Sequence, residues 1–361
     1  MEMLSKDKRV STDVWFSAHL LQWYSVHKRS LPWRKTKDPY RIWISEIILQ
    51  QTRVDQGLPY YKAFIEKFPD IKSLAAADER TVLKSWQGLG YYSRARNLHS
   101  AAKAVVDSGG KFPEAFKDII KLKGIGDYTA AAISSICFNE PRAVLDGNVY
   151  RVLARFKGIN TAIDSTQGKK LFSAIANDFL DKLSPGDYNQ AVMEFGALCC
   201  KPSNPECDTC ILSVTCAAYQ AGAVASFPVK TKKVKKRSRY FNYVVIEGDS
   251  GSYYQKRGAR DIWENMYEPL LIESSKYLDQ SEIVNSPEWI HLFGNQANVE
   301  LIPSESLDHK LTHQTIKARF WKVKSRFLSL KAGAPLKEIT EEDMEEIPIP
   351  RLIEKYLALD C

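Results

Sequence analysis

The first two thirds of the chain repeat apolar residues with the period of an α-helix. Between Thr12 and about Ala225, apolar side chains recur at helical spacings, and Pro, Gly, Asp or Ser separate the runs. Alternation of the strand type is nearly absent there. We therefore predict a mainly α region with helices over residues 14–27, 42–54, 60–68, 82–90, 129–138, 148–156 and 169–180.

The pattern changes from Tyr240 onward. Short runs rich in β-branched and aromatic residues predict strands over 240–248, 252–257, 269–273 and 316–323. Helical spacing returns near 277–284 and 351–359. A chain of 361 residues also exceeds what one hydrophobic core usually organises, so we expect the last third to form a second, α+β domain.

A basic tract separates the two regions. Seven of the ten residues from Lys230 to Arg239 are Lys or Arg and none is acidic, so the tract is too charged to bury and is typical of a linker. The predicted organisation is a helical domain over residues 1–228, a basic linker over 229–239 and a smaller α+β domain over 240–361.

The formal net charge of +8 is distributed unevenly. Residues 1–229 carry 30 Lys or Arg against 23 Asp or Glu (+7), the tract adds +7, and residues 240–361 carry 14 against 20 (−6). The first part and the tract suit a polyanion such as nucleic acid, although an ordinary solvated surface is the alternative. We find no apolar run of the roughly 18–20 residues of a membrane span and no secretory signal. We therefore expect a cytoplasmic protein, associated with the nucleoid in a bacterium.

Four of the seven cysteines lie close together, with six, two and five residues between them: Cys200, Cys207, Cys210 and Cys216. Clustered thiols in an intracellular protein are more often metal ligands than disulfide partners, and four thiolates suit zinc or an iron–sulfur cluster. A zinc ribbon usually has two CxxC pairs, whereas this segment has one, which favours a structural 4Fe–4S cluster. We expect ordinary thiols at Cys137, Cys199 and Cys361.

A glycine-containing turn joins two helical patterns at Gly124 and Gly126. Glycine lets the backbone approach a ligand closely, and the free N–H groups of the following helix attract anions. Asp127 is a candidate N-cap of that helix. An ordinary helix–helix turn is the more frequent explanation of such a pair. Followed by four clustered cysteines, the turn favours a helix–hairpin–helix that holds a DNA phosphate without reading sequence.

Two carboxylates have unusual surroundings. Asp146 precedes a helix that starts near Asn148, where it could simply be an N-cap. Glu46 is the lone charge among apolar residues, and partial burial would raise its pKa until it can act as a general acid near neutral pH. Two acids in different environments are what cleavage of an N-glycosidic bond requires: one protonates the leaving base, and the other stays ionised beside the sugar cation.

Six motifs in this order resemble the endonuclease III-like superfamily of helix–hairpin–helix DNA glycosylases, and within it the adenine DNA glycosylases. They are LPWR, SEIILQQT, GLGYYSRARNLH, LKGIGDYTAAAI, LDGNVYRVLARF and the cysteine cluster, and the resemblance covers nearly all of residues 12–225. It implies double-stranded DNA with adenine opposite 8-oxoguanine or guanine as the substrate, a 4Fe–4S cluster as the cofactor, and a monomer.

The resemblance also implies catalytic roles. Glu46 matches the acid that protonates adenine, Asp146 the carboxylate that stabilises the sugar cation, and Asn148 a residue that orients these groups. Tyr128 stands where bifunctional relatives carry a lysine nucleophile, so we expect a monofunctional glycosylase without a Schiff base. Extruding a base requires unstacking, and some side chains must support the gap. The resemblance assigns DNA or base contacts to Trp33, Arg34, Gln51, Thr52, Tyr91, Arg94, Gly124 and Gly126.

The last third resembles the Nudix-like 8-oxoguanine recognition domain of this family. Thr312 and His313 match its recognition loop, but Leu311 replaces the family's aromatic residue. The acid-rich magnesium-binding helix of a nucleotide hydrolase is not recognisable near 277–284. We therefore expect a recognition module. Two alternatives remain at this point: a pyrimidine-specific glycosylase of the same superfamily, and a DNA-binding protein without catalytic activity.

Overall fold

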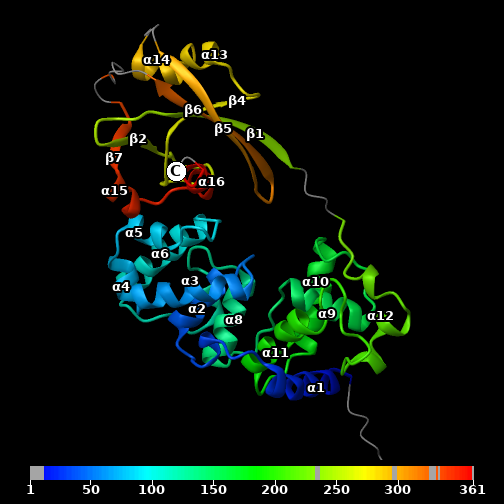
Figure 1. Cartoon of the computed structure of the whole chain (residues 1–361). Helices are drawn as coiled ribbons and strands as arrows, with labels where there is room; N and C mark the ends of the chain where they lie inside the picture. The colour runs from blue at the N-terminus through cyan, green and yellow to red at the C-terminus, as the bar shows by residue number, and fades with distance from the viewer. Residues whose placement is uncertain (1–11, 232–235, 295–298, 325–330, 332–333, 360–361) are drawn as a thin grey trace, which may run out of the picture. The chain divides into compact units, whose positions relative to one another are not determined.

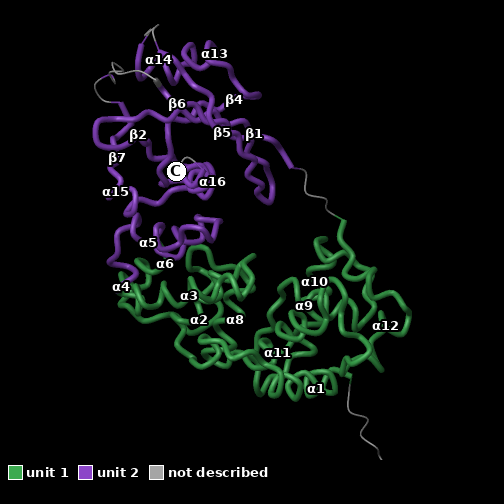
Figure 2. The backbone as a smooth tube through the Cα atoms, in the orientation of Figure 1, with its two compact units in different colours: residues 1–72, 100–232 green, residues 73–99, 233–361 purple. Residues whose placement is uncertain are grey.

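The computed structural model describes residues 12–231, 236–294, 299–324, 331 and 334–359 (Figure 1). Cys361 lies outside this part. The described chain divides into two compact units, which Figure 2 distinguishes by colour. Unit 1 comprises residues 1–72 and 100–232, and unit 2 comprises residues 73–99 and 233–361. Segment 73–99 is therefore grouped with the C-terminal part, which the sequence pattern did not suggest.

Unit 1 is helical. Its elements, including two that continue into segment 73–99, are α1 (Thr12–His27), η1 (Pro32–Arg34), α2 (Pro39–Ile48), α3 (Val54–Lys67), α4 (Ile71–Ala76), α6 (Ser93–Asp107), α7 (Phe116–Ile119), α8 (Asp127–Phe138), α9 (Gly147–Lys157), α10 (Thr166–Asp178), α11 (Pro185–Leu198), η2 (Ser213–Thr215), α12 (Ala217–Gln220) and η3 (Val224–Ser226). Helix α11 packs against α1, α8 and α9, and α8 also packs against α2. The helices that carry the predicted carboxylates thus belong to one packed group.

Glycines let α11 approach its neighbours closely. A Cβ atom on Gly186 would lie 2.8 Å from the Ser135 carbonyl oxygen of α8, and one on Gly196 would lie 2.7 Å from the Cβ atom of Asn148 on α9. Such separations are well inside ordinary van der Waals contact. The two glycines therefore fix how near α8 and α9 lie to α11.

Unit 2 adds α5 (Glu79–Ser85) to an α+β fold. Its other elements are β1 (Arg237–Val245), β2 (Gly251–Lys256), β3 (Tyr267–Glu268), β4 (Leu270–Ser274), α13 (Gln280–Val284), α14 (Pro287–Phe293), β5 (Glu300–Lys310), β6 (Gln314–Lys324), β7 (Leu336–Thr340), α15 (Glu341–Glu346) and α16 (Arg351–Leu357). The larger sheet has the order β4-β1-β6-β5 and the smaller one β3-β2-β7. Only β1 and β6 among these described pairs are parallel.

The unit 2 core lies on the larger sheet, where apolar side chains of β1, β4 and β6 meet α13 and α14. Its fully buried members include Val244, Ile283 and Trp289. Strands β5 and β6 form a hairpin that Leu311 closes by donating its backbone N–H to the Gln314 carbonyl at 2.8 Å. This turn places Thr312 and His313 at the exposed tip of the hairpin.

The predicted fold class, a mainly α first part and an α+β last part, is confirmed, but several boundaries differ. The helix predicted over 42–54 is interrupted between Ile48 and Val54, and the one predicted over 82–90 ends at Ser85. Gln51 and Gly88 have positive φ angles of 56° and 93°, which no helix continues through. Strand β1 starts at Arg237, inside the predicted linker, because the backbone from there pairs with β6. No helix among the described residues is long and apolar enough to span a membrane.

A buried ion pair joins the strands of unit 2. The guanidinium of Arg257 donates to the Glu268 carboxylate at 2.7 Å, and the hydroxyl of Tyr243 donates to its other oxygen at 2.8 Å. Glu268 is only 1% exposed and Arg257 8%. Each charge is therefore held away from water by partners that match its hydrogen-bonding capacity.

We predict that Glu268→Ala destabilises unit 2 by about 3 kcal/mol, because it leaves a buried guanidinium with one of its carboxylates missing. Glu305→Ala, which removes an exposed carboxylate on β5, should change stability by about 0.5 kcal/mol or less. Denaturant unfolding of both variants measures the difference. Equal destabilisation by the two substitutions would contradict the role of the buried pair.

Candidate active site

Glu46 is a buried acid on α2. The helix starts at Pro39, where Asp38 caps it by accepting the Tyr40 N–H at 3.0 Å. Apolar neighbours including Ile47 and Ile48 hold Glu46 in the interior, where it is 9% exposed. Burial raises the pKa of Glu46 to about 7, a hydrogen bond with Tyr128 opposes this, and the charge of Asp146 adds to it. A large fraction of Glu46 is therefore protonated at neutral pH.

Asp146 occupies a different environment, at the N-terminus of α9. One carboxylate oxygen accepts the backbone N–H groups of Asn148 and Val149 at 2.9 and 2.8 Å, and the other accepts the Asn148 side-chain amide at 2.6 Å. Burial raises the pKa of Asp146, but these hydrogen bonds oppose the shift because they favour the ionised form. Asp146 is thus an N-cap as well as a candidate for chemistry.

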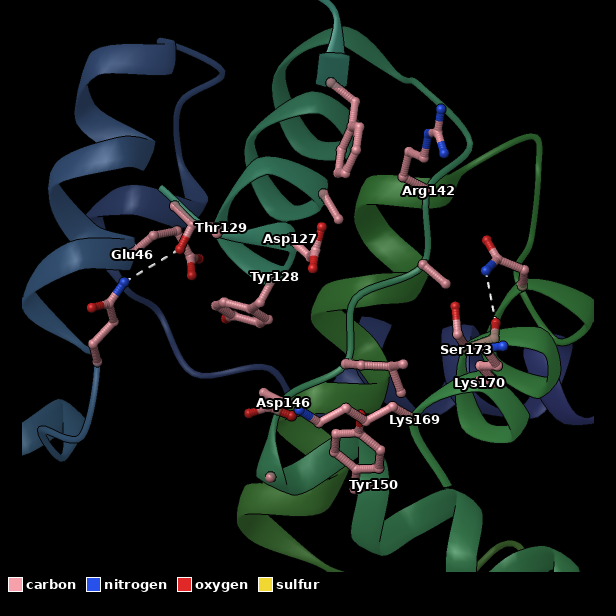
Figure 3. Close-up of a pocket in the computed structure, with 18 of the residues that line it drawn as sticks. Glu46, Asp127, Tyr128, Thr129, Arg142, Asp146, Tyr150, Lys169, Lys170 and Ser173 are labelled. Carbon is pink, nitrogen blue, oxygen red and sulfur yellow. Dashed lines mark hydrogen bonds between the residues drawn. The ribbon is translucent and has the colours of Figure 1, made fainter. Parts of the chain in front are cut away.

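The two acids share cavity space with Tyr128. A large cavity of about 1180 Å³ and a smaller one of about 180 Å³ are both lined by Glu46, Tyr128 and Asp146. Figure 3 shows these side chains reaching the large cavity from α2, α8 and the start of α9. The sequence did not reveal that Lys169 and Lys170 of α10 line it too. A cavity of this size accommodates a nucleotide and part of the backbone that carries it.

The smaller cavity is lined by several residues that the sequence predicted for the site and by one acid that it did not. Trp33, Arg34, Thr52 and Asn148 all line it, as does Glu194 of α11. Arg34 donates to both oxygens of Glu194 at 2.7 and 2.6 Å, and Arg29 does so at 2.9 and 2.7 Å. Burial would raise the pKa of Glu194, but the hydrogen bonds of the two arginines outweigh it and lower the pKa to about 2. Glu194 therefore fixes the guanidinium of Arg34 in the wall.

Glu194 carried the same sequence signal as Glu46. It is a lone acid in the apolar stretch Ala191–Leu198, a pattern that could have identified it but that we did not use. Its partners Arg29 and Arg34 lie more than a hundred residues away along the chain, so only the packed helices reveal what it binds.

The predicted hairpin turn lies beside this cavity. Gly124 has a φ of 84°, the left-handed region that glycine tolerates, and Gly126 and Tyr128 line the large cavity with Asp127. The expectation that Asp127 caps α8 is wrong: Gly126 is the N-cap, and Asp127 is the first residue of the helix. The backbone here has no capping side chain, so the N–H groups at the start of α8 keep their capacity to bind an anion.

Two residues predicted to support the DNA gap have a rare backbone conformation. Gln51 lines the large cavity with a φ of 56°, and Tyr91 in unit 2 has a φ of 49°. Residues other than glycine seldom adopt this region, and they do so most often at functional sites. Both side chains are exposed, Tyr91 by 43%. The turns that carry them therefore present these side chains outward.

Unit 2 brings Tyr91 to the predicted recognition loop. The hydroxyl groups of Tyr91 and Thr312 are hydrogen-bonded, and both residues line a cavity of about 570 Å³ together with His313. Arg94, to which the resemblance assigns a DNA contact, is largely buried. Its guanidinium lies over the rings of Trp86 and Tyr91, at 5.3 and 5.6 Å from the centroids, and burial lowers its pKa to about 10. In this structure Arg94 supports the Tyr91 ring.

The clustered cysteines line one pocket of unit 1. Cys200, Cys207, Cys210 and Cys216 all face it, among apolar side chains such as Phe156 and Phe195. The guanidinium of Arg155 donates to the sulfur of Cys200 at 3.4 Å, and the Leu212 N–H donates to that of Cys210 at 3.4 Å. Such donors suit thiolates bound to a metal cluster.

These thiols are a donor set for a metal group. Within the described part of the chain, no three His, Cys, Asp or Glu side chains gather closely enough to be recognised as a metal site. Cys199 lines the same pocket beside the four predicted ligands. Four thiolates at one pocket suit either a tetrahedral zinc ion or an iron–sulfur cluster.

Comparisons with known proteins agree with this geometry. Residues 44–177 match the HhH-GPD superfamily of base excision DNA repair proteins. The adenine DNA glycosylase of Buchnera aphidicola subsp. Schizaphis graminum is 34% identical over 305 residues, which cover 83% of this chain and 85% of the relative. The chain belongs to the adenine DNA glycosylase family. It is therefore an enzyme of base excision DNA repair.

Other adenine DNA glycosylases match over shorter lengths. That of Arabidopsis thaliana is 40% identical over 63% of this chain and 41% of its own length, and the human enzyme is 40% identical over 57% and 39%. Among solved structures, a thermostable thymine-DNA glycosylase has a TM-score of 0.54 and 29% identity over 58% of this chain and 97% of its own. Endonuclease III trapped on DNA, with a TM-score of 0.51 and 20% identity over 61% of this chain and 99% of its own, shares the fold.

The raised pKa of Glu46 predicts how the stability of this adenine DNA glycosylase family member depends on pH. Because the pKa of Glu46 is about 7 in the folded protein and 4.5 as a free side chain, the folded protein binds more protons between these pH values. Stability contributed by protonated Glu46 is complete below pH ~4.5 and is lost as the pH rises to ~7. Glu46→Gln, which cannot ionise, should be more stable than wild type at pH 8 by at most about 3 kcal/mol.

Thermal unfolding at pH 8 and pH 5 measures this effect. The Tm gain of Glu46→Gln over wild type should be several degrees at pH 8 and much smaller at pH 5. Glu66→Gln, at an exposed acid on α3, is the matched control and should show no such dependence. An equal Tm difference at both pH values would show that Glu46 is not desolvated.

Proposed function

We propose that the protein is a monofunctional adenine DNA glycosylase that releases adenine mispaired with 8-oxoguanine or guanine in double-stranded DNA. The observation that carries the proposal is the shared cavity of Glu46, Tyr128 and Asp146, in which two acids have different surroundings. The hydrolysis of an N-glycosidic bond needs one acid to donate a proton and one to remain ionised beside a cation.

In the proposed complex, backbone N–H groups bind the DNA phosphates, and such contacts do not depend on the base sequence. The turn from Gly124 to Gly126 and the start of α8 would bind a phosphate, so that the extruded adenosine enters the adjoining cavity. Extrusion costs a few kcal/mol of stacking. Gln51, Thr52 and Tyr91 would offset part of this cost by wedging beside 8-oxoguanine and holding it in the helix. Trp33 and Arg34, held by Glu194, would form the wall against the base.

In the proposed reaction, protonated Glu46 gives its proton to N7 of adenine while the bond between N9 and C1′ breaks. Adenine then leaves as a neutral base, and the electron deficiency remains on the sugar as an oxocarbenium ion. Asp146, oriented by Asn148 at 2.6 Å, stabilises this cation and can form a transient bond to C1′. Ionised Glu46 then accepts a proton from the water that adds to C1′, and the bond from C1′ to Asp146 breaks to restore its carboxylate.

Tyr128 explains why the proposed enzyme would not cleave the DNA strand. A strand-cleaving relative needs an amine that attacks C1′ and forms a Schiff base, and a phenol cannot do so. The hydroxyl of Tyr128 donates to the Met193 sulfur at 3.2 Å, and the acids Glu46 and Asp146, after burial, raise its pKa well above the ordinary value. Tyr128 therefore stays protonated and would act only by hydrogen bonding to Glu46.

The proposed role of unit 2 is to recognise the base opposite adenine. The hairpin tip carries Thr312 and His313, and the Tyr91 hydroxyl contacts Thr312. The proposal takes the domain over residues 240–361 to be Nudix-like and to act as a recognition module. Cytoplasmic localisation and a monomeric state belong to the same proposal.

Base release from defined duplexes tests the function. Wild type should release adenine opposite 8-oxoguanine and opposite guanine, whereas thymine opposite guanine, the substrate of the pyrimidine-specific alternative, should stay intact. Glu46→Gln and Asp146→Asn should each lower the single-turnover rate by at least about 10³-fold, because each removes a group used in the transition state. Glu66→Gln should retain the wild-type rate.

The controls separate the alternatives. Duplex affinity of the two inactive variants should stay within about threefold of wild type, as expected if they affect chemistry and not binding. Borohydride reduction during turnover should give little covalent protein–DNA product. Release of thymine alone would establish the pyrimidine-specific alternative, and binding without release of any base by wild type would establish a non-catalytic DNA-binding protein.

We also propose that Cys200, Cys207, Cys210 and Cys216 hold a structural 4Fe–4S cluster. When bound, the cluster would crosslink residues 200–216 and supply no step of the reaction. Purified protein should be yellow-brown, with iron and sulfide in equal amounts. Cys207→Ser should lose the colour and the iron, while Cys137→Ser, at a cysteine outside the pocket, keeps both. Colourless protein with one zinc ion would refute the cluster.

A further inference from the structure

A cavity in unit 2 has several cations in its wall. It measures about 570 Å³, and its wall includes the cations Arg96, Arg260 and Lys310 and the acid Asp261, beside Tyr91, Trp263 and Thr312. Residues 240–361 carry 14 Lys or Arg against 20 Asp or Glu, a balance of −6, so this cluster of cations is not a sample of the average surface. A cavity of this charge within an acidic region indicates an anionic ligand.

The loop from Gly258 to Asn265, between β2 and β3, brings Arg260 to this cavity. Three of its residues, none of them glycine, have positive φ angles: Arg260 at 69°, Trp263 at 58° and Asn265 at 66°. Such conformations persist only where the surroundings hold them in place, and they gather at binding sites. The loop thus has glycine-like backbone angles at three residues that carry side chains.

Ion pairs and hydrogen bonds hold the loop on several sides. Asp261 accepts hydrogen bonds from Arg239 at 2.7 and 2.6 Å and from Arg257 at 2.6 Å. Glu264 pairs with Arg96 of α6 at 3.2 Å, and Arg96 also donates to the Glu264 carbonyl at 2.9 Å. Both acids of the loop are thus engaged within unit 2.

Two further contacts fix the end of the loop. Asn265 donates its side-chain amide to Glu79 of α5 at 2.6 Å. Trp263 is 7% exposed and packs edge-on against Phe241 and His309, with ring centroids 6.2 and 5.7 Å away. The loop is therefore a pinned scaffold, which keeps the entropy lost on binding small.

Arg260 differs from the other polar residues of the loop, because its guanidinium takes no part in the ion pairs and hydrogen bonds described above. Its backbone N–H donates to Glu264 at 3.3 Å, which orients the residue, while the side chain is exposed. Within the described chain, no acidic side chain forms an ion pair with Arg260, in contrast to Arg96, Arg239 and Arg257. A guanidinium that lines a cavity on a well-held loop is suited to bidentate binding of a phosphate.

We propose that Arg260, assisted by Lys310, binds a backbone phosphate of the DNA strand that carries the base opposite adenine. The choice of strand rests on the proposed function, because Tyr91 and Thr312 line the same cavity and are proposed to contact that base. Phosphate binding there would fix the register of the strand while the hairpin tip inspects the base. Arg260 is thus a positioning residue for recognition, separate from the phosphate site of the α8 hairpin.

Binding measurements on the full-length protein test this proposal. The probe is a duplex with a non-cleavable 2′-fluoro-adenosine opposite 8-oxoguanine, and its Kd is measured by fluorescence anisotropy at several salt concentrations. Arg260→Ala should weaken binding about tenfold at low salt and reduce the slope of log Kd against log salt by about 1, as loss of one phosphate contact predicts. Lys337→Ala removes an exposed cation of β7 outside the cavity and should change neither quantity.

Single methylphosphonate substitutions identify the phosphate. Neutralising one position on the strand opposite adenine should weaken wild-type binding but leave the affinity of Arg260→Ala unchanged, since the contact is already lost. An unchanged salt slope for Arg260→Ala, or coupling to a phosphate of the adenine strand, would overturn the proposal. Adenine release by wild type is measured separately on the cleavable duplex, so loss of release refutes the proposed function and not the contact.

Discussion

The candidate active site depends on the burial of Glu46, which keeps water away from its carboxyl group. A carboxyl group on α2 would ordinarily be ionised, but apolar neighbours remove the solvent that stabilises its charge and raise its pKa to about 7. Asp146 borders the same cavities, yet three N–H donors from Asn148 and Val149 favour its ionised form. Burial raises the pKa of both acids. Three N–H groups oppose this shift at Asp146, whereas a hydrogen bond with Tyr128 opposes it at Glu46.

The surrounding helices must be packed closely for this arrangement to hold. Gly196 of α11 lies against Asn148, and the side chain of Asn148 in turn orients Asp146. Asn148 therefore connects the packing of α11 directly to the candidate site. Glu194, two residues before Gly196, draws Arg29 and Arg34 to the wall of the smaller cavity. Helix α11 therefore supports the site both by its small residues and by its one buried acid.

In unit 2, ion pairs between carboxylates and guanidinium groups hold β3 and the neighbouring loop in place. The carboxylates of Glu268, Asp261 and Glu264 each receive guanidinium groups, and these pairs fix strand β3 and the loop that precedes it. Segment 73–99 contributes Glu79, Tyr91 and Arg96 to the same network. The hairpin of β5 and β6 and Tyr91 are consequently in contact, although 221 residues separate Tyr91 from Thr312.

The sequence alone determined the helical and strand regions, because apolar spacing reports which side of an element is buried. It also indicated Glu46, whose isolation among apolar residues is local, and Asp146, whose place before a helix is local too. It failed at Gln51, where a turn replaces the expected helix, and at Asp127, which follows the N-cap Gly126. Such backbone choices depend on packing beyond the immediate neighbours.

Only the tertiary structure decided which distant groups meet. Three features left no periodic pattern in the chain: the pairing of Glu194 with Arg29 and Arg34, the grouping of segment 73–99 with the C-terminal strands, and the place of Arg260 in a cavity wall. The spacing of apolar residues indicates which face of an element is buried. The hydrogen-bond partner of a side chain depends instead on how the helices and strands pack together. The residue types of the site could therefore be found from the sequence, but their partners and their protonation could not.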